Sequence, residues 1–277
     1  MTIHKTTQWI DAFIKKKDQK SKKEAFRLQQ SMLSKYLGEF FPAVEPSAIQ
    51  QHLLQHGLFA ADISENDWQE WKQQCYTQAV EKMYLKCKHS WKGPDTDIFI
   101  FPSNETIPEL NEWFNGNAGL SFPDKLFLFL QKGAARREIA ALVIHEYSHI
   151  CRLHRFPKAE QDYTLEDAIM LEGIAEWLVR KMVGPSYGNK RVSLVTDKEL
   201  TRLWKKWIEP NQQVTRGNAK HDLIMYGMRG APKNLGYIIG FNVVHRFMKA
   251  KKCPATNLLH TNNENILNET SFHLPKN

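Results

Sequence analysis

The chain has 277 residues, of which 42% are hydrophobic and 11% aromatic. This composition excludes an intrinsically disordered chain and is sufficient for one large hydrophobic core or for two. The formal net charge is +8, and much of the basic excess lies in the lysine-rich run Lys15–Lys23. Because no basic recognition motif accompanies this run, we interpret it as a solvated surface and expect no nucleic-acid partner.

The cysteines and the apolar runs bear on the cellular compartment of the protein and on membrane insertion. The four cysteines form no C-x-x-C pair, which argues against a cysteine-ligated zinc and against a dense disulfide framework. Reduced thiols are typical of the cytosol. The N-terminus shows no signal peptide, and no apolar run reaches the length that spans a membrane. We therefore expect a cytoplasmic protein without membrane insertion, and the sequence does not indicate its oligomeric state.

Residues 1–90 are predicted to form a helical N-terminal region. Apolar residues recur at helical spacing in residues 7–16, 25–37 and 46–57. A capping sequence that starts at Ser64 opens a longer amphipathic helix through Tyr84. No chemical motif lies in this region, so we assign it a supporting role.

Residues 91–277 form the second predicted domain, and it begins with strands. Asp97–Phe101 is a short apolar run that Pro102 stops, and Leu126–Leu130 is another directly before a long apolar helix. We expect these strands to form a small sheet packed on that helix. Residues 109–114 are expected to form a helical turn.

A third strand is expected between those two. An extended peptide can add to an exposed edge strand of a sheet through main-chain hydrogen bonds. Our candidate for a substrate-binding edge strand is the segment that begins with Ala118, Gly119 and Leu120. An ordinary hairpin strand is an equal alternative.

The long apolar helix, predicted from Ala134 to Leu153, carries the motif His145-Glu146-Tyr147-Ser148-His149. Residues four apart on a helix lie on one face, so His145 and His149 can direct their imidazoles at a single ion. Glu146 follows the first ligand, where its carboxylate can reach a water on that ion. This is the H-E-x-x-H arrangement of zinc peptidases, with two ligands and a general base.

A third ligand separates such a site from a core helix with two buried histidines. The metzincin pattern requires Gly at 152 and His at 155, but Arg152 and Arg155 occupy these positions. The gluzincin pattern requires a glutamate on a following helix, and Glu172 lies 23 residues after His149. Gly173 has no Cβ and allows these two helices to approach closely.

The helix that carries Glu172 has clear bounds. Thr164 and Asp167 form a capping-box pattern at its start, and Gly184-Pro185 ends it. Glu176 lies one turn beyond Glu172, where it can accept the N–H of the second imidazole and fix its tautomer. Two histidines, one glutamate and a water make a catalytic rather than a closed zinc site. The alternative for both glutamates is a solvated helix face.

A later helix begins at Leu235 and is expected to run to about Lys249. Gly236 and Gly240 are four apart, so one side of this helix can pack closely against another element. We interpret Tyr237, between them, as the residue that stabilises the oxyanion. The alternatives are a core position for Tyr237 or another residue in that role: His221, Tyr226, Arg229 or His245. The Asn- and Thr-rich tail from residue 253 is expected to be partly disordered.

Three segments, HEYSH, MLEGIAE and LGYIIG, together resemble a domain-of-unknown-function family described as predicted zinc-dependent proteases, with a gluzincin-type ligand set. The resemblance covers about residues 91–248. It implies His145, His149 and Glu172 as ligands and Glu146 as the base. It implies no particular substrate.

We therefore expect an α+β, mostly helical protein with a zincin-like metallopeptidase core behind a helical N-terminal region. Its expected activity is Zn²⁺-dependent hydrolysis of a peptide or protein, in which Glu146 activates a water on the zinc. The alternative is a non-catalytic zinc-binding regulatory or scaffolding protein. The presence of Glu146 argues against it, since a structural site needs no base.

Overall fold

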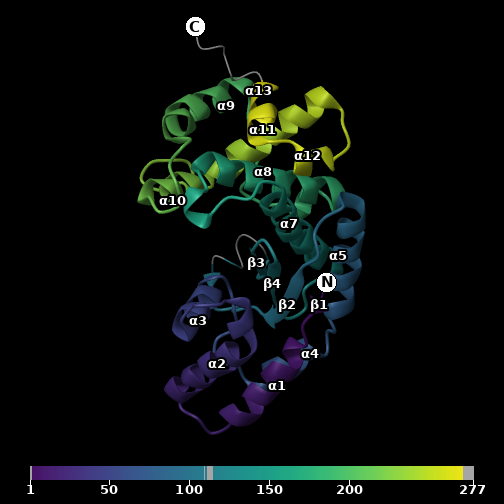
Figure 1. Cartoon of the computed structure of the whole chain (residues 1–277), viewed down its shortest axis with the longest axis vertical. Helices are drawn as coiled ribbons and strands as arrows, with labels where there is room; N and C mark the ends of the chain where they lie inside the picture. Colours follow the sequence, from purple (N-terminus) through teal and green to yellow (C-terminus); the bar gives the residue numbers. More distant parts are fainter. Residues whose placement is uncertain (1, 109, 111–114, 271–277) are drawn as a thin grey trace. The chain divides into compact units, whose positions relative to one another are not determined.

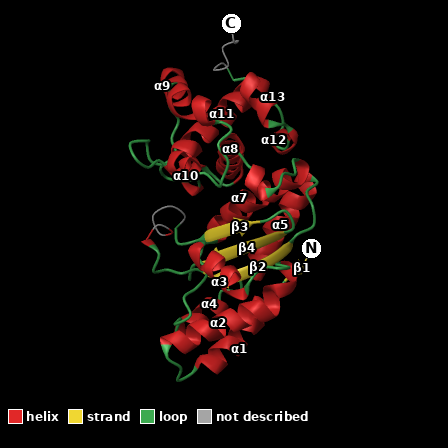
Figure 2. Ribbon diagram, turned by 60° about the vertical axis from the view of Figure 1, so that its left-hand side comes forward, coloured by secondary structure: helices red, strands yellow, loops and turns green. Residues whose placement is uncertain are grey.

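The computed structural model describes residues 2–108, 110 and 115–270 (Figure 1). The fold is α+β and mostly helical, as expected: 61% of it is helical, and four strands form a mixed sheet (Figure 2). No helix within these residues combines the length and the apolar character that crossing a membrane requires. The helical turn expected at 109–114 lies outside the described residues, apart from Leu110.

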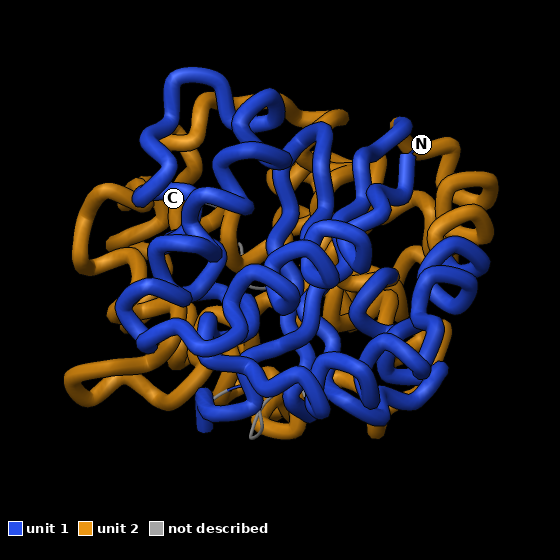
Figure 3. Tube along the Cα trace, turned by 90° about the horizontal axis from the view of Figure 1, so that it is seen from below, with its two compact units in different colours: residues 1–83, 95–143 blue, residues 84–94, 144–277 orange. Residues whose placement is uncertain are grey.

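The chain divides into two compact units (Figure 3). The first contains residues 1–83 and 95–143, and the second contains residues 84–94 and 144–277. These units differ from the division at residue 90 that we expected, because the sheet shares a unit with the N-terminal helices. The division at residue 90 stays a prediction about domains.

The N-terminal helices of the first unit follow their capping signals. They are α1 (Thr6–Lys17), α2 (Lys22–Leu37), α3 (Pro46–Gln55) and α4 (Glu65–Lys72). The single helix predicted from Ser64 to Tyr84 is wrong: α4 ends at Lys72 and α5 (Thr77–Trp91) follows it. Between them Cys75 has a φ of 51°, a left-handed conformation that a helix cannot contain.

The sheet has the strand order β1-β2-β4-β3. Its strands are β1 (Thr2–Ile3), β2 (Asp97–Pro102), β3 (Ala118–Ser121) and β4 (Lys125–Leu130). β2 and β4 are parallel and in register, and the rings of Phe99 and Phe127 stack across them at 4.7 Å. Every residue of β4 is buried, as the apolar run Leu126–Leu130 predicts for all but the first residue, Lys125.

Strand β3 pairs antiparallel with β4 and lies at one end of the strand order. It contains Ala118, Gly119 and Leu120, so the prediction that these residues form an edge strand is confirmed. Their role in binding a substrate stays a prediction.

The second unit is helical in its described residues. Helix α7 (Arg136–Arg155) begins in the first unit and ends in the second. The others are α8 (Leu165–Met182), α9 (Asp197–Leu203), α10 (Ala219–Tyr226), α11 (Leu235–Lys251), α12 (Asn257–His260) and α13 (Asn263–Asn268), and a π-helical turn (Trp204–Ile208) follows α9. The bounds of α8 and its capping box between Thr164 and Asp167 agree with the prediction.

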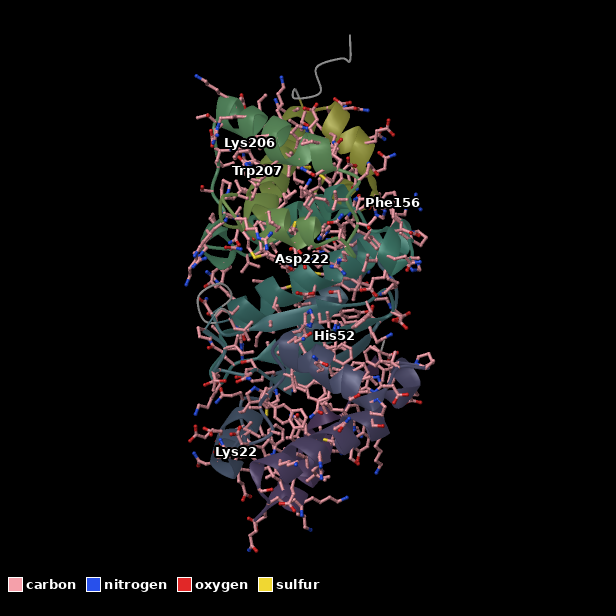
Figure 4. The ribbon with its side chains drawn as sticks, turned by 90° about the vertical axis from the view of Figure 1, so that its left-hand side faces the viewer. Lys22, His52, Phe156, Lys206, Trp207 and Asp222 are labelled. Carbon is pink, nitrogen blue, oxygen red and sulfur yellow. The ribbon has the colours of Figure 1, made fainter. Side chains whose placement is uncertain are left out.

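The tail from Cys253, which we expected to be partly disordered, contains the ordered helices α12 and α13, and its residues 271–277 lie outside the described residues. The buried guanidinium of Arg152, on α7, donates to the carbonyl oxygens of Leu258 and Thr261 at 2.7 and 2.8 Å. It also donates to Asn263 Oδ1 at 2.7 Å and lies over the ring of Phe156, which is labelled in Figure 4. An arginine distant in sequence therefore holds this segment in place.

Helices α8 and α11 pack on each other backbone to backbone (Figure 1). A Cβ placed on Gly173 would lie 2.2 Å from the carbonyl carbon of Gly240. A Cβ placed on Gly240 would lie 2.1 Å from the carbonyl oxygen of Ile169. The predicted close approach at Gly240 is thus confirmed, whereas the residue that faces Gly173 lies on α11 and not, as we expected, on the helix of the HEYSH motif.

We predict that Gly240→Ala lowers the free energy of unfolding by about 2 kcal/mol, as overpacking typically does. The higher intrinsic helix propensity of Ala would stabilise the variant by about 1 kcal/mol. A net loss of stability would therefore show that the steric clash between α8 and α11 outweighs this gain. Chemical denaturation of the full-length variant would measure it. Gly217→Ala is the control, since no atom lies within 4 Å of a Cβ there. Equal midpoints for the two variants would contradict the prediction.

Candidate metal centre

Three side chains from α7 and α8 converge in the second unit. His145 and His149 lie one turn apart on α7, and their ring centroids are 4.7 Å apart at 89°. His145 Nε2 lies 3.2 Å from Glu172 Oε2, and His149 Nε2 lies 3.7 Å from Glu172 Oε1. Each of the three residues offers a ligand atom within 4.8 Å of the others. The structure thus brings together the three residues that the sequence predicted as ligands.

A buried carboxylate oxygen of this cluster lacks a hydrogen-bond partner in the described structure, which is expected of an atom that binds a cation. Glu172 Oε2 is buried without a hydrogen-bond partner among the described residues, since its contact with His145 lacks hydrogen-bond geometry. An unsatisfied buried polar group costs about 1–3 kcal/mol, and more when it is charged. Two imidazoles and one carboxylate are the donor set of a catalytic zinc site. The residues present therefore fit zinc.

The charges within the cluster also suit a cation. Burial lowers the pKa of His149 to about 4, so this imidazole is neutral at neutral pH. Burial acts against ionisation of Glu172, but the adjacent imidazoles of His149 and His145 outweigh it and keep the pKa of Glu172 below its ordinary value. For His145, burial lowers the pKa, but the close contact with Glu172 and the charge of that carboxylate overcome this effect and raise the pKa to about 9. His145 is the ligand that must lose a proton when a metal binds.

Glu146 follows His145 directly on α7, and Tyr237 lies on α11, the helix that packs on α8. Glu146 is buried on α7, next to His145. Tyr237 is in the first turn of α11, and burial and then the charge of Glu172 raise its pKa well above the ordinary value. The charge of Glu146 also contributes to that rise. Tyr237 therefore keeps its phenolic proton at neutral pH and can donate a hydrogen bond.

The role predicted for Glu176 needs correction. Its Oε1 accepts hydrogen bonds from Arg180 Nε at 2.5 Å and from the backbone N–H of Asn189 at 3.0 Å. His149 Nδ1 is buried and has no hydrogen-bond partner in the described structure, so the expected bond from the second imidazole is absent. The physical reason is competition: Arg180, one turn farther along α8, binds the carboxylate instead. Glu176 thereby ties the loop at Asn189 to α8.

The alternatives to Tyr237 fall in different places. The Tyr226 ring lies 6.3 Å from the Tyr237 ring, and burial and the charge of Glu172 raise the pKa of Tyr226. His221 is buried and its Nδ1 lies 2.8 Å from a carboxylate oxygen of Asp222, which is labelled in Figure 4. The His245 ring lies 5.9 Å from that of Phe241. Among these three residues, Tyr226 is therefore the one whose ring lies near Tyr237 and whose pKa responds to the charge of Glu172.

Sequence reasoning missed one charged residue at this centre, Arg216. It lies in a polar, Gly-containing stretch without periodicity, so no sequence signal marked it. The charge of Arg216 is among the causes that set the pKa of Glu172, with the two imidazoles and burial before it.

Comparison with known proteins identifies the family of this chain. Residues 76–268 match the model of the family described as "Predicted Zn-dependent protease (DUF2268)". A curated relative, the uncharacterized protein YjaZ of Bacillus subtilis (strain 168), is 33% identical over 225 residues, which cover 79% of this chain and 86% of the relative. No solved structure matches the chain. On the extent of these matches, the chain belongs to the family of predicted Zn-dependent proteases.

Proposed function

We propose that this protein is a zinc-dependent metallopeptidase of the gluzincin type, which hydrolyses peptide bonds in a peptide or protein. The observation that carries the proposal is the convergence of His145, His149 and Glu172, with the buried Glu146 next to the first ligand. Membership of a family of predicted Zn-dependent proteases supports the same class of reaction.

In this proposal, a bound zinc supplies Lewis acidity toward a carbonyl oxygen and a water. The two imidazoles and the Glu172 carboxylate hold the ion. Glu146 takes a proton from the attacking water onto its carboxylate and then gives it to the nitrogen of the leaving amine. Tyr237 donates its phenolic O–H to the substrate oxygen that gains negative charge.

A non-catalytic zinc-binding protein is the competing function. A structural zinc site is closed by four protein ligands, whereas the cluster found in the described residues has three. A structural site also needs neither a buried carboxylate beside a ligand nor a tyrosine that keeps its proton. These features favour the catalytic proposal.

The first prediction concerns the metal. We expect about one zinc per chain, and we expect Glu172→Ala to weaken zinc binding at least about 100-fold, since even outer-shell partners of ligands contribute about 10- to 100-fold. Competition with a chelator of known affinity would measure this. Glu166→Ala, on the same helix, is the matched control. Equal zinc affinity in the two variants would remove Glu172 from the ligand set.

The second prediction concerns the base. Glu146→Gln keeps the size of the side chain but cannot accept the proton, so we expect turnover of a peptide library to fall about 10²- to 10⁴-fold. Zinc content and the unfolding midpoint should stay at the wild-type values, and Glu166→Gln should cleave like the wild type. Undiminished cleavage by zinc-loaded Glu146→Gln would show that this carboxylate is not the base.

The third prediction separates the two tyrosines. We expect Tyr237→Phe to lower kcat about 10²-fold with a smaller change in KM, because the donor acts mainly on the charge that develops during the reaction. Tyr226→Phe should change kcat much less. Steady-state kinetics on one peptide would compare them. The opposite order of effects would assign the oxyanion role to Tyr226.

A further inference from the structure

The turn between α1 and α2 gathers basic side chains at one end of the first unit. In Figures 1 and 2 this turn lies at the end of the unit opposite to the sheet. Helix α1 ends in three lysines, and α2 begins with two more. The exposed cations around the turn, which we call the basic tip, are Lys15, Lys16, Lys20, Lys22, Lys23 and Arg27. From the sequence alone we interpreted the run Lys15–Lys23 as a solvated surface.

Hydrogen bonds hold the backbone of this turn. The hydroxyl oxygen of Ser21 accepts from the backbone N–H of Glu24 at 3.3 Å, and the Glu24 carboxylate accepts from the N–H of Ser21 at 2.9 Å. The N–H of Lys20 donates to the carbonyl oxygen of Lys17 at 3.0 Å. The capping box directs the carboxylate of Glu24 toward the start of α2. The tip is therefore a built turn, and the acidic residue within α2 is engaged in capping.

Most cations of the basic tip have no anionic partner. Lys22 pairs with Asp62 at 2.9 Å, but its side chain is 89% exposed, and such a surface pair is easily exchanged for another anion. Lys23 and Arg27 are four apart on α2, a spacing at which like charges destabilise a helix. No ion pair with another described residue is formed by Lys15, Lys16, Lys20, Lys23 or Arg27. Their positive charge is therefore available to an anionic partner.

An exposed aromatic ring lies among these cations. Phe26 is 46% exposed, whereas the preceding Ala25 is buried, so α2 packs on the unit with one side and presents the other to solvent. Phe26 is four residues after Lys22 and three after Lys23, and these spacings place the three side chains on one face of the helix. Phenylalanine flanked by lysines is typical of helices that lie in a membrane interface. There the lysine stems cover apolar surface while the ammonium groups stay in water.

We propose that the basic tip binds the surface of an anionic phospholipid membrane. The cations contact headgroup phosphates, and the ring of Phe26 enters the boundary between headgroups and acyl chains. Stable anchoring needs more than one such signal, so this binding is peripheral and reversible. The proposal concerns the first unit alone and is independent of the metal centre.

Nucleic acid is the competing anionic partner. Proteins that bind single strands stack successive bases on several aromatic rings. Residues 15–27 contain one aromatic residue, Phe26, and it lies beside the lysines of a helix face. One ring that enters a lipid interface fits this composition better than a row of stacked bases.

The test is co-sedimentation of the full-length protein with two kinds of vesicle: phosphatidylcholine alone, and phosphatidylcholine mixed with phosphatidylglycerol in equal parts. The variants are Lys23→Glu/Arg27→Glu and Phe26→Ala. The control is Lys205→Glu/Lys206→Glu, which makes the same change in net charge on the second unit. There the Lys206 ammonium lies 5.0 Å from the centroid of the Trp207 ring, and Figure 4 labels both residues. Unfolding midpoints verify that each variant is folded.

We expect the wild type to bind the mixed vesicles at least about ten-fold more tightly than phosphatidylcholine. Lys23→Glu/Arg27→Glu should weaken this binding at least about 25-fold, because each basic residue near an anionic surface contributes about five-fold. Phe26→Ala should weaken it about five-fold, the effect of burying about half of a phenylalanine ring. The control should bind like the wild type.

Three results would overturn the proposal. They are equal binding to both kinds of vesicle, equal weakening by the control pair, and an affinity that Phe26→Ala leaves unchanged. A competition assigns the partner: an oligonucleotide, duplex or single-stranded, is added at the same concentration of phosphate groups as the vesicles. Protein that stays with the mixed vesicles supports the membrane, and protein released to the oligonucleotide would show a nucleic-acid surface instead.

Discussion

Helices α8 and α11 touch backbone to backbone at Gly173 and Gly240, and the candidate active centre depends on this contact. Glu172 directly precedes the first glycine, and Tyr237 lies three residues before the second. A side chain at either glycine would force the helices apart and separate these groups. Catalytic groups must be held within about 0.5 Å of their productive geometry, and a close-packed helix pair is suited to this.

Buried charges around this helix pair stabilise it from both ends. At one end, Arg152 bonds the C-terminal segment to α7, and Asn263 of that segment donates to Asp167 near the start of α8. At the other end, Glu176 and Arg180 bond the loop at Asn189 to α8. Breaking a buried pair of this kind is costly because one charge is left unpaired.

The sequence predicted the parts of the centre that follow from helical periodicity. The four-residue spacing of His145 and His149 places both on one face of α7, and the capping box fixes the helix on which Glu172 lies. The apolar strands β2 and β4 and the start of α11 at Leu235 are also where they were expected.

The rest depends on contacts between residues distant in sequence. Arg152 bonds to Leu258 across 106 positions, and no local pattern predicts such a bond. Glu176 has two possible partners, an imidazole and Arg180, and only the packing of α8 decides between them. The break at Cys75 is a backbone conformation that most non-glycine residues avoid, so the sequence favoured a continuous helix there.

The most direct test of a catalytic zinc centre is zinc K-edge X-ray absorption on the full-length, zinc-loaded protein. A zinc ion held by His145, His149 and Glu172 should show a first shell of nitrogen and oxygen only, at about 2.0–2.2 Å, with the scattering of two imidazoles. His149→Ala should lose zinc, or bind it with the scattering of one imidazole. A sulfur scatterer at about 2.3 Å, or a spectrum that His149→Ala leaves unchanged, would show that zinc binds elsewhere and contradict the account.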